Sequence, residues 1–394
     1  MRAYDGIIIG GGAAGLYAAF HAGRRGRRVL VIEHNSEVGA KILISGGGRC
    51  NFTNLQASPE RFISANPHFA RSALARHTQA NFVTLVKKHG IAFYEKTLGQ
   101  LFCDGPRSSQ NIVRMLLDEC YAAGVDIVCG ARVSAVRRAE RFVVETSVGA
   151  FEGETLTIAT GGLPIPKLGA SGFAFEIADQ FGVPVVPTRP GLVPLTFSER
   201  DLAWMRPLSG ISADVRAHAG KAAFREAALF THRGLSGPAV LQVSSYWAPG
   251  DAIHLNWLPD AAEHLLIERK RERPKAQLKT ALASVLPERL AIALAAEADA
   301  AQDTVLGDLK DAVLIELMGK LKAWPLTPVG TEGYVKAEVM VGGVDTNALS
   351  QQTMEAREAP GLFFIGEAVD VTGWLGGYNF QWAWSSGWAA GQAI

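Results

Sequence analysis

Cysteine is scarce in this chain, and its few cysteines do not form the pattern of a metal site or of a disulfide scaffold. The 394 residues contain four cysteines, none of them in a C-x-x-C pair, and no histidine pair has zinc-ligand spacing. We therefore expect no metal site. Because a chain of this length does not need disulfides to fold, we also expect it to reside in a reducing, cytoplasmic compartment.

An excess of charge and a long apolar run are equally lacking. The 39 basic and 38 acidic residues nearly cancel, which predicts no nucleic-acid partner and no anionic membrane partner. The chain has no strictly apolar run of about 18 residues or more, so we expect no membrane span. The N-terminal stretch begins with the charged Arg2 and Asp5 and is interrupted by glycines, which argues against a signal peptide.

Glycine, by contrast, is abundant, and the most informative of the 42 glycines lie near the start. The apolar run 6–9 leads into Gly10-Gly11-Gly12-Ala13-Ala14-Gly15, and the helix-forming run 16–20 follows. A second apolar run, 28–32, ends on Glu33, 18 residues after the last glycine of the motif. A G-x-G-x-x-G motif between strand and helix, with an acid at this distance, predicts a βαβ dinucleotide-binding unit. The alternative is a tight structural turn that binds no ligand.

Each residue type in this motif has a physical reason. Gly10 permits the turn, Gly12 lets the backbone approach a pyrophosphate, and Gly15 lets the helix pack closely on the strand. The phosphates would lie at the helix N-terminus, where free N–H groups and the helix dipole favour negative charge. Glu33 would accept hydrogen bonds from ribose hydroxyls and repel a 2′-phosphate, so FAD or NAD fits better than NADP.

A second glycine-rich segment, Ser45-Gly46-Gly47-Gly48-Arg49-Cys50-Asn51, follows Glu33 closely. Its glycines would leave backbone N–H groups accessible to a flat ring or a phosphate, and Arg49 could pair with a diphosphate. The alternative is an ordinary glycine loop with a surface arginine. Since no second cysteine is near enough in the sequence to resolve a disulfide, we interpret Cys50 as a packed or ring-contacting residue rather than a redox thiol.

Two further apolar strands end on small or acidic residues. A strand over 154–159 runs into Thr160-Gly161-Gly162, and a strand over 361–365 ends on Gly366-Glu367. A Gly-Glu strand end offers a carboxylate to a ribityl chain or a pyrophosphate. Further on, Gly376-Gly377-Tyr378-Asn379 opens a helix predicted over 380–392. A Gly-Gly turn at this point would aim the positive end of the helix dipole at the negative charge of a reduced flavin.

The remaining sequence between these motifs predicts a discontinuous nucleotide-binding domain that is interrupted by an insertion. Its first part contains helices over 67–89 and 109–123 and strands over 125–128, 132–137 and 141–146. Four prolines between 184 and 194 predict a linker. The insertion is expected to be mainly β over 195–258 and helical over 261–323. The predicted division is 1–189 for the first part of the nucleotide-binding domain, 190–260 and 261–327 for the insertion, and 328–394 for the final part.

Within the insertion, two features could carry function. In Thr231-His232-Arg233-Gly234-Leu235-Ser236-Gly237-Pro238, Ser236 is predicted to cap a helix whose first turn contains Pro238. His232 could be a proton donor or a substrate ligand, or a merely structural histidine. The run Glu268–Arg273 mixes both signs of charge without aromatic residues, and we interpret it as a solvated helix face rather than a nucleic-acid patch.

Taken together, residues 7–15, the segment from Lys41 through Ser45–Asn54, and the segment 366–381 resemble one bacterial family. It is the family of NAD(P)/FAD-dependent oxidoreductase flavoproteins that includes aminoacetone-oxidase-like and BaiN-like proteins, and the resemblance covers essentially the whole chain. It implies bound FAD, an α/β fold with a Rossmann-like domain, and an inserted domain with a β-barrel-like and a helical part.

Position by position, the resemblance implies roles for the motif residues. Gly10, Gly12, Ala14 and Gly15 would hold the pyrophosphate, Glu33 the adenosine ribose, and the Val133 backbone the adenine, while the later segments would line the diphosphate, the ribityl chain and the isoalloxazine. The predicted cofactor-binding set is Gly10, Gly12, Ala13, Ala14, Gly15, Glu33, His34, Lys41, Ser45, Gly46, Gly47, Gly48, Arg49, Cys50, Asn51, Val133, Thr160, Gly161, Gly162, Gly366, Glu367, Gly376, Gly377, Tyr378 and Asn379.

Two departures from the family pattern bear on the substrate. Relatives tend to carry a Gly-x-x-Gly-Asp-Gly-like stretch where this chain has Gly169-Ala170-Ser171-Gly172-Phe173-Ala174, and they often carry threonine where this chain has Met340. Both positions lie where a substrate would reach the flavin, so the resemblance does not transfer a substrate.

The sequence therefore predicts an FAD-dependent oxidoreductase that moves a hydride between a small organic substrate and flavin N5. NAD(P)H and O2 are the candidate redox partners, although no second nucleotide fingerprint is present. The catalytic residue is open, with His232 as a weak candidate. Two alternatives remain: an FAD-containing RNA-modification factor, for which a basic face would be needed, and a flavin-binding protein without catalytic activity.

Overall fold

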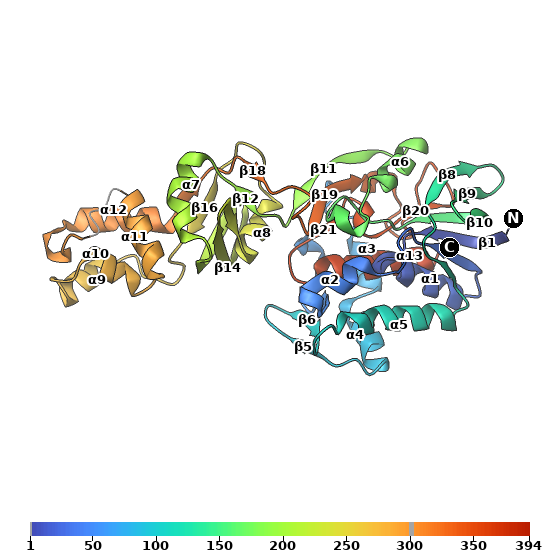
Figure 1. Ribbon diagram of the computed structural model, residues 1–394, viewed down its shortest axis with the longest axis horizontal. Helices are drawn as coiled ribbons and strands as arrows, with labels where there is room; N and C mark the ends of the chain where they lie inside the picture. Colours follow the sequence, from blue (N-terminus) through green and yellow to red (C-terminus); the bar gives the residue numbers. More distant parts are fainter. Residues whose placement is uncertain (1, 299–302) are drawn as a thin grey trace. The chain divides into compact units, whose positions relative to one another are not determined.

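A computed structural model describes residues 2–298 and 303–394 and divides them into two compact units. Unit 1 contains the chain up to Arg189 together with Val339–Ile394, and unit 2 is the continuous stretch Pro190–Glu338. Figure 1 shows that blue and red segments, the two ends of the sequence, lie together in unit 1. The predicted glycine motifs therefore belong to one compact unit.

A parallel sheet with one antiparallel edge forms the centre of unit 1. Its strands pair in the order β7-β2-β1-β10-β9-β8, and β20 pairs with β10 in addition. The strands β7, β2, β1, β10 and β20 run parallel, as predicted for a Rossmann-like α/β fold. Their bounds are β1 Arg2–Ile9, β2 Val29–Ile32, β7 Asp126–Val128, β8 Val133–Arg138, β9 Phe142–Thr146, β10 Gly149–Ile158 and β20 Leu362–Phe364.

Small residues let the helices α1 (Ala13–Arg24) and α13 (Tyr378–Gly391) pack very closely on one another. A Cβ added to Gly387 would lie 2.6 Å from the carbonyl oxygen of Ala14, and one added to Gly391 would lie 2.7 Å from that of Ala18. Because α1 follows the opening motif and α13 follows the closing motif, this contact ties the two motifs together. The remaining helices of the unit are α2 Ala40–Gly48, α3 Arg71–Arg76, α4 Gln79–Lys88, α5 Ser109–Ala122 and α6 Phe173–Gln180.

Two predictions for unit 1 differ from the structure. The single helix expected over 67–89 is interrupted, because His77 is non-helical (φ −135°, ψ 88°) and Thr78 starts α4 through a capping box with Asn81. The linker expected over 184–194 is wrong, since β11 (Val185–Gly191) pairs with β19 (Val339–Val344). Its prolines are tolerated because this ladder has only two strands, so each strand is an edge.

The other short strands of unit 1 support the motifs. The strands β3 (Asn51–Asn54), β6 (Gln100–Cys103) and β5 (Phe93–Glu95) form one antiparallel sheet. The strands β4 (Phe62–Ile63) and β21 (Thr372–Gly373) form another.

Unit 2 is built on an antiparallel sheet of seven strands in the order β17-β16-β13-β14-β15-β12-β18. A helical part, 265–322, follows the first five strands in the sequence, as the composition predicts. Ser236 lies in β15 and does not cap a helix, because α8 begins at Pro238 with Gly237 as its N-cap. The strands are β12 Leu195–Thr196, β13 Ser212–Ala219, β14 Ala222–Thr231, β15 Gly234–Ser236, β16 Ile253–Asn256, β17 Trp324–Leu326 and β18 Gly330–Thr331.

The helices of unit 2 are short. They are α7 Glu199–Met205, α8 Pro238–Ser244, α9 Leu265–Glu272, α10 Leu278–Ala283, α11 Glu288–Glu297 and α12 Asp311–Lys322. Across the described parts of both units, none of the helices has the length and apolar character needed to cross a bilayer.

Candidate cofactor site

Three loops meet at the carboxyl ends of the central parallel strands. Ile9 pairs with Ile158, and Ile158 pairs with Phe364, so the turns that follow β1, β10 and β20 lie next to one another. A Cβ added to Gly10 would lie 2.4 Å from the carbonyl oxygen of Ala159, and one added to Gly366 would lie 2.9 Å from Cβ of Ala14. Ligands of open α/β sheets bind at this edge, so the opening and closing motifs form one candidate site.

The turn into α1 is closed on one side and open on the other. A Cβ on Gly15 would lie 1.9 Å from the carbonyl oxygen of Gly10, whereas a Cβ on Gly12 would meet no atom within 4 Å. Gly12 is the N-cap of α1, and no side chain caps the helix there. The first N–H groups of α1 therefore face open space, which is the arrangement that binds a diphosphate.

The carboxylate of Glu33 is buried at the end of β2 and is held by the turn itself. Its Oε2 accepts a hydrogen bond from the Gly11 N–H at 2.8 Å, and its Oε1 accepts one from the Asn35 N–H at 2.8 Å. The Nδ1 atom of His34 lies 3.1 Å from the same Oε1. Each carboxylate oxygen has two lone pairs, so this fixed carboxylate can still accept from ribose hydroxyls.

The second glycine segment is the irregular end of a helix rather than a simple loop. Within α2, Ser45 leaves the helical conformation (ψ 147°), and Gly46 and Gly47 have φ values of +57° and +66°. A Cβ on Gly47 would meet no atom within 4 Å. The Arg49 guanidinium donates to the hydroxyl of Tyr94 at 3.0 Å, so the structure shows this arginine bound to β5.

Cys50 lies beside Cys103, a cysteine that is distant from it in the sequence. Cys103 lies at the end of β6 beside Cys50, because Asn51 pairs with Phe102 and the Cys103 N–H donates to the Arg49 carbonyl at 2.9 Å. Burial raises the pKa of Cys50 far above its usual range and that of Cys103 to about 12. Neither is a thiolate at neutral pH, so the geometry supports the packed interpretation of Cys50.

Residues from the second, third and last motifs meet at Glu367. Its Oε2 pairs with Lys41 Nζ at 2.5 Å, and its Oε1 accepts from the Met340 N–H at 3.3 Å. The same Oε2 would lie 3.9 Å from a Cβ on Gly161. Nearby, Thr160 Oγ1 is buried and has no hydrogen-bond partner within the described part of the chain. An orphaned hydroxyl beside an ion pair fits a polar ligand at this strand edge.

The start of α13 is shaped by backbone that only glycine adopts easily. Gly376 and Gly377 have φ values of +109° and +94°, and a Cβ on Gly377 would lie 2.4 Å from the Thr53 carbonyl oxygen. The amide of Asn379 both accepts from the Gly373 N–H (2.8 Å) and donates to the Gly373 carbonyl (2.9 Å). The loop before α13 is therefore held to the helix that follows it.

Several positioning residues of this site have no motif of their own. Ser386 Oγ accepts from the Gly366 N–H at 3.1 Å, and the indole of Trp382 donates to the Gly366 carbonyl at 2.9 Å. Both residues are buried in α13. The only sequence signal for Ser386 and Trp382 is that serines and tryptophans occur together in an otherwise apolar helix.

Two remaining predicted residues lie differently. Val133 begins β8, two residues after Ala131, whose N–H donates to the Glu33 carbonyl at 3.0 Å. It is thus close in the chain to the ribose end of the site. His232 belongs to unit 2 and is exposed at the turn between β14 and β15. Within unit 1, the predicted flavin contact Tyr378 accepts a hydrogen bond from the Arg61 guanidinium at 2.8 Å.

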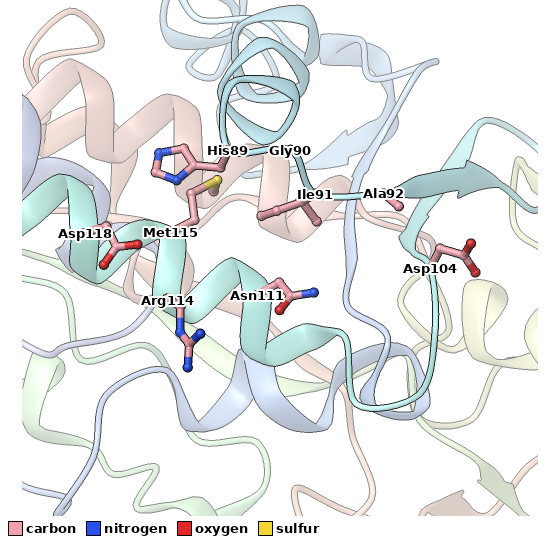
Figure 2. A pocket seen from close by; sticks show the side chains of 9 residues that line it. All are labelled: His89, Gly90, Ile91, Ala92, Asp104, Asn111, Arg114, Met115 and Asp118. Atoms are coloured by element: carbon pink, nitrogen blue, oxygen red, sulfur yellow. The ribbon is translucent and has the colours of Figure 1, made fainter.

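A separate hollow of about 380 Å³ lies between the end of α4 and α5 (Figure 2). It takes in none of the predicted cofactor residues, and its side chains carry both signs of charge. Its lining residues are His89, Gly90, Ile91, Ala92, Asp104, Asn111, Arg114, Met115 and Asp118. The strand edge described above, and not this hollow, has the open helix N-terminus and fixed carboxylate that suit FAD.

Comparison with known proteins agrees with the fold. The family model for the HI0933-like protein Rossmann domain matches residues 4–393. The chain is 52% identical over 398 residues to the ribosomal RNA dihydrouridine synthase of Escherichia coli K12, which covers 100% of this chain and 98% of that protein. It is 46% identical to the protein of the same name from Haemophilus influenzae, over 99% and 98% of the two chains. A 3-dehydro-bile acid delta(4,6)-reductase of Clostridium scindens is 30% identical, over 98% of each chain.

These relatives correct one expectation. The neutral net charge predicts no nucleic-acid partner, and that prediction is wrong, because two relatives that match over the full length are named for an enzyme of ribosomal RNA. Net charge averages over the whole chain and therefore does not detect a local basic segment. The resemblance to the BaiN-like flavoproteins, by contrast, is confirmed by the family model and the Clostridium relative.

Proposed function

The chain belongs to the HI0933-like Rossmann-domain family, and from that membership we propose that it reduces a uridine base of ribosomal RNA to dihydrouridine. FAD is its cofactor, and oxidoreduction is its class of chemistry. The observation that carries the proposed substrate is the 52% identity to the Escherichia coli synthase along the full length of both proteins.

The reaction saturates one double bond and consumes two electrons and two protons. Uracil C5=C6 is conjugated to the C4 carbonyl, so a hydride added at C6 moves negative charge onto O4, and a proton then adds at C5. The bile acid named for the Clostridium relative also has double bonds conjugated to a carbonyl at position 3. Reduction of a carbon–carbon double bond conjugated to a carbonyl is the chemistry that these two names share.

Bound FAD, once reduced, would supply the hydride through N5. The protein's own residues hold and orient it: the N-terminus of α1 at Gly12 would bind the diphosphate, and Glu33 the adenosine ribose. The Lys41–Glu367 pair would lie along the middle of the dinucleotide. The N-terminus of α13 at Gly377 would face the flavin ring, where its positive dipole end favours the reduced, negatively charged form.

The electron donor and the location follow from this reaction. A net reduction needs a reductant, so NAD(P)H is the proposed donor and O2 is at most a competing acceptor. A ribosomal RNA substrate supports the cytoplasm as the proposed location. The alternative substrate is a small enone such as a bile-acid derivative, and a flavin-binding protein without activity is the second alternative.

The test uses the purified holoprotein and ribosomal RNA transcribed in vitro, which contains no dihydrouridine. Under anaerobic conditions with NADH or NADPH, digestion of the RNA and mass spectrometry of its nucleosides should show dihydrouridine. Glu33→Arg should lower the yield of product in proportion to its loss of FAD, whereas Glu37→Arg, the same charge change at a nearby exposed position, should retain both. A flavin that NADH or NADPH reduces, without any dihydrouridine formed, would contradict the proposal.

A further inference from the structure

We propose that Arg271, Arg273 and Lys275 of unit 2 bind the phosphate backbone of the RNA substrate. The inference rests on the proposed function, because it names the surface by which the same enzyme holds its RNA. It also revises the interpretation of this run as a solvated helix face.

The local charge density singles out this segment. The seven residues from Arg269 to Lys275 contain five cations and one carboxylate, Glu272. They cover the C-terminal half of α9 and the turn that follows it. Acidic residues elsewhere in the chain cancel these cations in the net charge, yet the segment produces a positive potential at its own surface.

Two of the five cations are neutralised by neighbours. Arg269 pairs with Glu272 at 3.0 Å, and Lys270 pairs with Asp311 at 2.7 Å. The other three, Arg271, Arg273 and Lys275, are exposed, and their side chains form no hydrogen bond or ion pair with any residue that the structure describes. Lys270 and, to a smaller extent, Arg271 lower the pKa of the Asp311 carboxyl, but none of the three exposed cations is held in an ion pair within the described residues.

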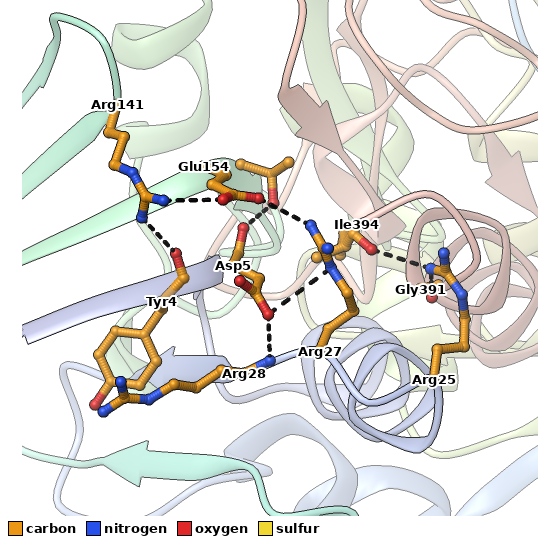
Figure 3. A network of polar contacts seen from close by, with 10 residues as sticks. Tyr4, Asp5, Arg25, Arg27, Arg28, Arg141, Glu154, Gly391 and Ile394 are labelled. Carbon is orange, nitrogen blue, oxygen red and sulfur yellow. Dashed lines mark hydrogen bonds and ion pairs between the residues drawn. The ribbon is translucent and has the colours of Figure 1, made fainter.

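The contrast with the other arginine-rich segment is direct. Arg24, Arg25, Arg27 and Arg28 also lie within five residues, but each has a partner in unit 1, and Figure 3 shows three of them in one polar network. The contacts are Arg24 with Glu119, Arg25 with the carbonyls of Gly391 and Ile394, Arg27 with Glu154, and Arg28 over the Tyr4 ring. These arginines are held by contacts within unit 1, whereas the three cations of unit 2 form no hydrogen bond or ion pair among the described residues.

The unpaired cations project from an ordered backbone. The Gly307 N–H donates to the Pro274 carbonyl at 2.8 Å, and the Leu306 N–H donates to the Ala276 carbonyl at 2.8 Å. Pro274 itself fixes one backbone dihedral between two of the cations. Since the backbone is already ordered, a ligand that binds here needs to order only the three side chains.

Phosphodiester oxygens are the ligands that suit such a segment. Guanidinium groups bind phosphate oxygens in pairs, and release of the RNA's condensed counterions makes the contact favourable. The segment carries no aromatic residue on which a base could stack. The contact is therefore expected to hold the backbone without reading the sequence.

The test measures affinity for a ribosomal RNA transcript as a function of salt. In the triple variant Arg271→Ala, Arg273→Ala, Lys275→Ala, the slope of log K against log salt should become shallower by about 2 to 3, and affinity should fall roughly tenfold or more in low salt. The matched control removes three exposed cations of unit 1, Lys87→Ala, Arg71→Ala and Arg132→Ala, and should leave the slope nearly unchanged. The double variant Arg271→Lys, Arg273→Lys should keep most of the wild-type slope of log K against log salt, because lysine keeps the positive charge.

The outcomes separate this inference from the proposed function. Equal affinity and slope in the triple variant and the wild type would overturn the inference, even if the wild type forms dihydrouridine. An equal loss in the control triple would also overturn it, since the effect would then be one of total charge. A loss specific to the unit 2 triple, in a wild type that forms no dihydrouridine, would support the RNA contact and contradict the reaction. FAD content, read from visible absorbance, should be the same in every variant.

Discussion

The opening and closing glycine motifs lie together in one candidate site, but they are held in different ways. Backbone atoms dominate the contacts of the opening motif, whereas side chains hold the closing motif. The opening motif is backbone against backbone: Gly15 packs on the Gly10 carbonyl, and no side chain caps α1 at Gly12. In the closing motif, the Gly366 peptide is held by the side chains of Ser386 and Trp382, which lie 20 and 16 residues further on. A distant side chain, that of Glu33, bonds the Gly11 N–H of the opening motif as well, whereas in the closing motif side chains bond both the N–H and the carbonyl of Gly366.

The largest effect should come from filling the tightest contact of the opening motif. In Gly15→Ala, the new Cβ would lie 1.9 Å from the Gly10 carbonyl oxygen, so α1 must move off β1. We expect the free energy of unfolding to fall by about 3 kcal/mol or more, together with loss of FAD. Chemical denaturation and visible absorbance would measure the two effects.

The matched control is Gly12→Ala, in the same turn. No atom lies within 4 Å of its new Cβ, and its φ of −86° suits alanine. Stability of the FAD-free protein should therefore be unchanged while FAD retention falls, because the methyl group points into the space where a diphosphate would bind. Equal destabilisation by both variants would contradict the division between packing glycine and ligand glycine.

The next effect concerns the acid that follows the opening motif. Glu33→Arg removes the carboxylate that the Gly11 and Asn35 N–H groups hold in place. FAD should bind more weakly by roughly 1.5–3 kcal/mol, the worth of charge-assisted hydrogen bonds to the ribose. Equilibrium dialysis of FAD would measure this loss, and unchanged retention would remove Glu33 from the ribose site.

A smaller effect should come from the side chains that support the closing motif. Ser386→Ala leaves the buried Gly366 N–H without its acceptor, which should cost about 1–2 kcal/mol of unfolding free energy. In Trp382→Phe the ring is retained but the indole donor to the Gly366 carbonyl is lost. If both variants were as stable as the wild type, the closing motif would not depend on side chains of α13.

The smallest effect is a pH dependence at the contact between α13 and the rest of the unit. Burial lowers the pKa of His77, whose ring stacks on Trp388, from 6.5 to about 4. The unfolded chain binds a proton here below pH 6.5, but the folded chain does so only near pH 4, so stability is present above pH 6.5 and is lost as pH falls toward 4. Between pH 7 and 6 the part of the loss that belongs to His77 should be below about 1 kcal/mol. Burial also lowers the pKa of the neighbouring His21 to about 3, so His77→Gln should reduce the loss without abolishing it. An undiminished loss in that variant would assign all of it to other groups.

The difference between the two motifs also explains how far the sequence could be interpreted. The strand, turn and helix around residues 10–15 could be predicted because adjacent residues determine them, and the helix after Gly377 could be predicted for the same reason. The proximity of Cys103 to Cys50 and the partners of Gly366 depend on strand pairing and helix packing between distant segments. Pairing with β19 likewise makes Val185–Gly191, most of the proline-rich stretch 184–194, a strand.

The exclusion of RNA failed for a related reason. Composition gives the sum of all charges, but only the structure shows which cations are already used by the fold. Arg24–Arg28 and Arg269–Lys275 are equally basic in the sequence, and they differ only in the partners that folding supplies.

The discontinuity of unit 1 has a consequence for biosynthesis. Unit 2 is one uninterrupted stretch, so all of its strands and helices are available once Glu338 has left the ribosome. Unit 1 lacks β20 and α13 until translation is almost finished. Until then, the edge of β10 that pairs with β20 is unpaired, and the face of α1 that packs on α13 is exposed. We therefore expect the nascent chain to acquire its cofactor last: a chain that ends at residue 338 should bind no FAD and stay colourless.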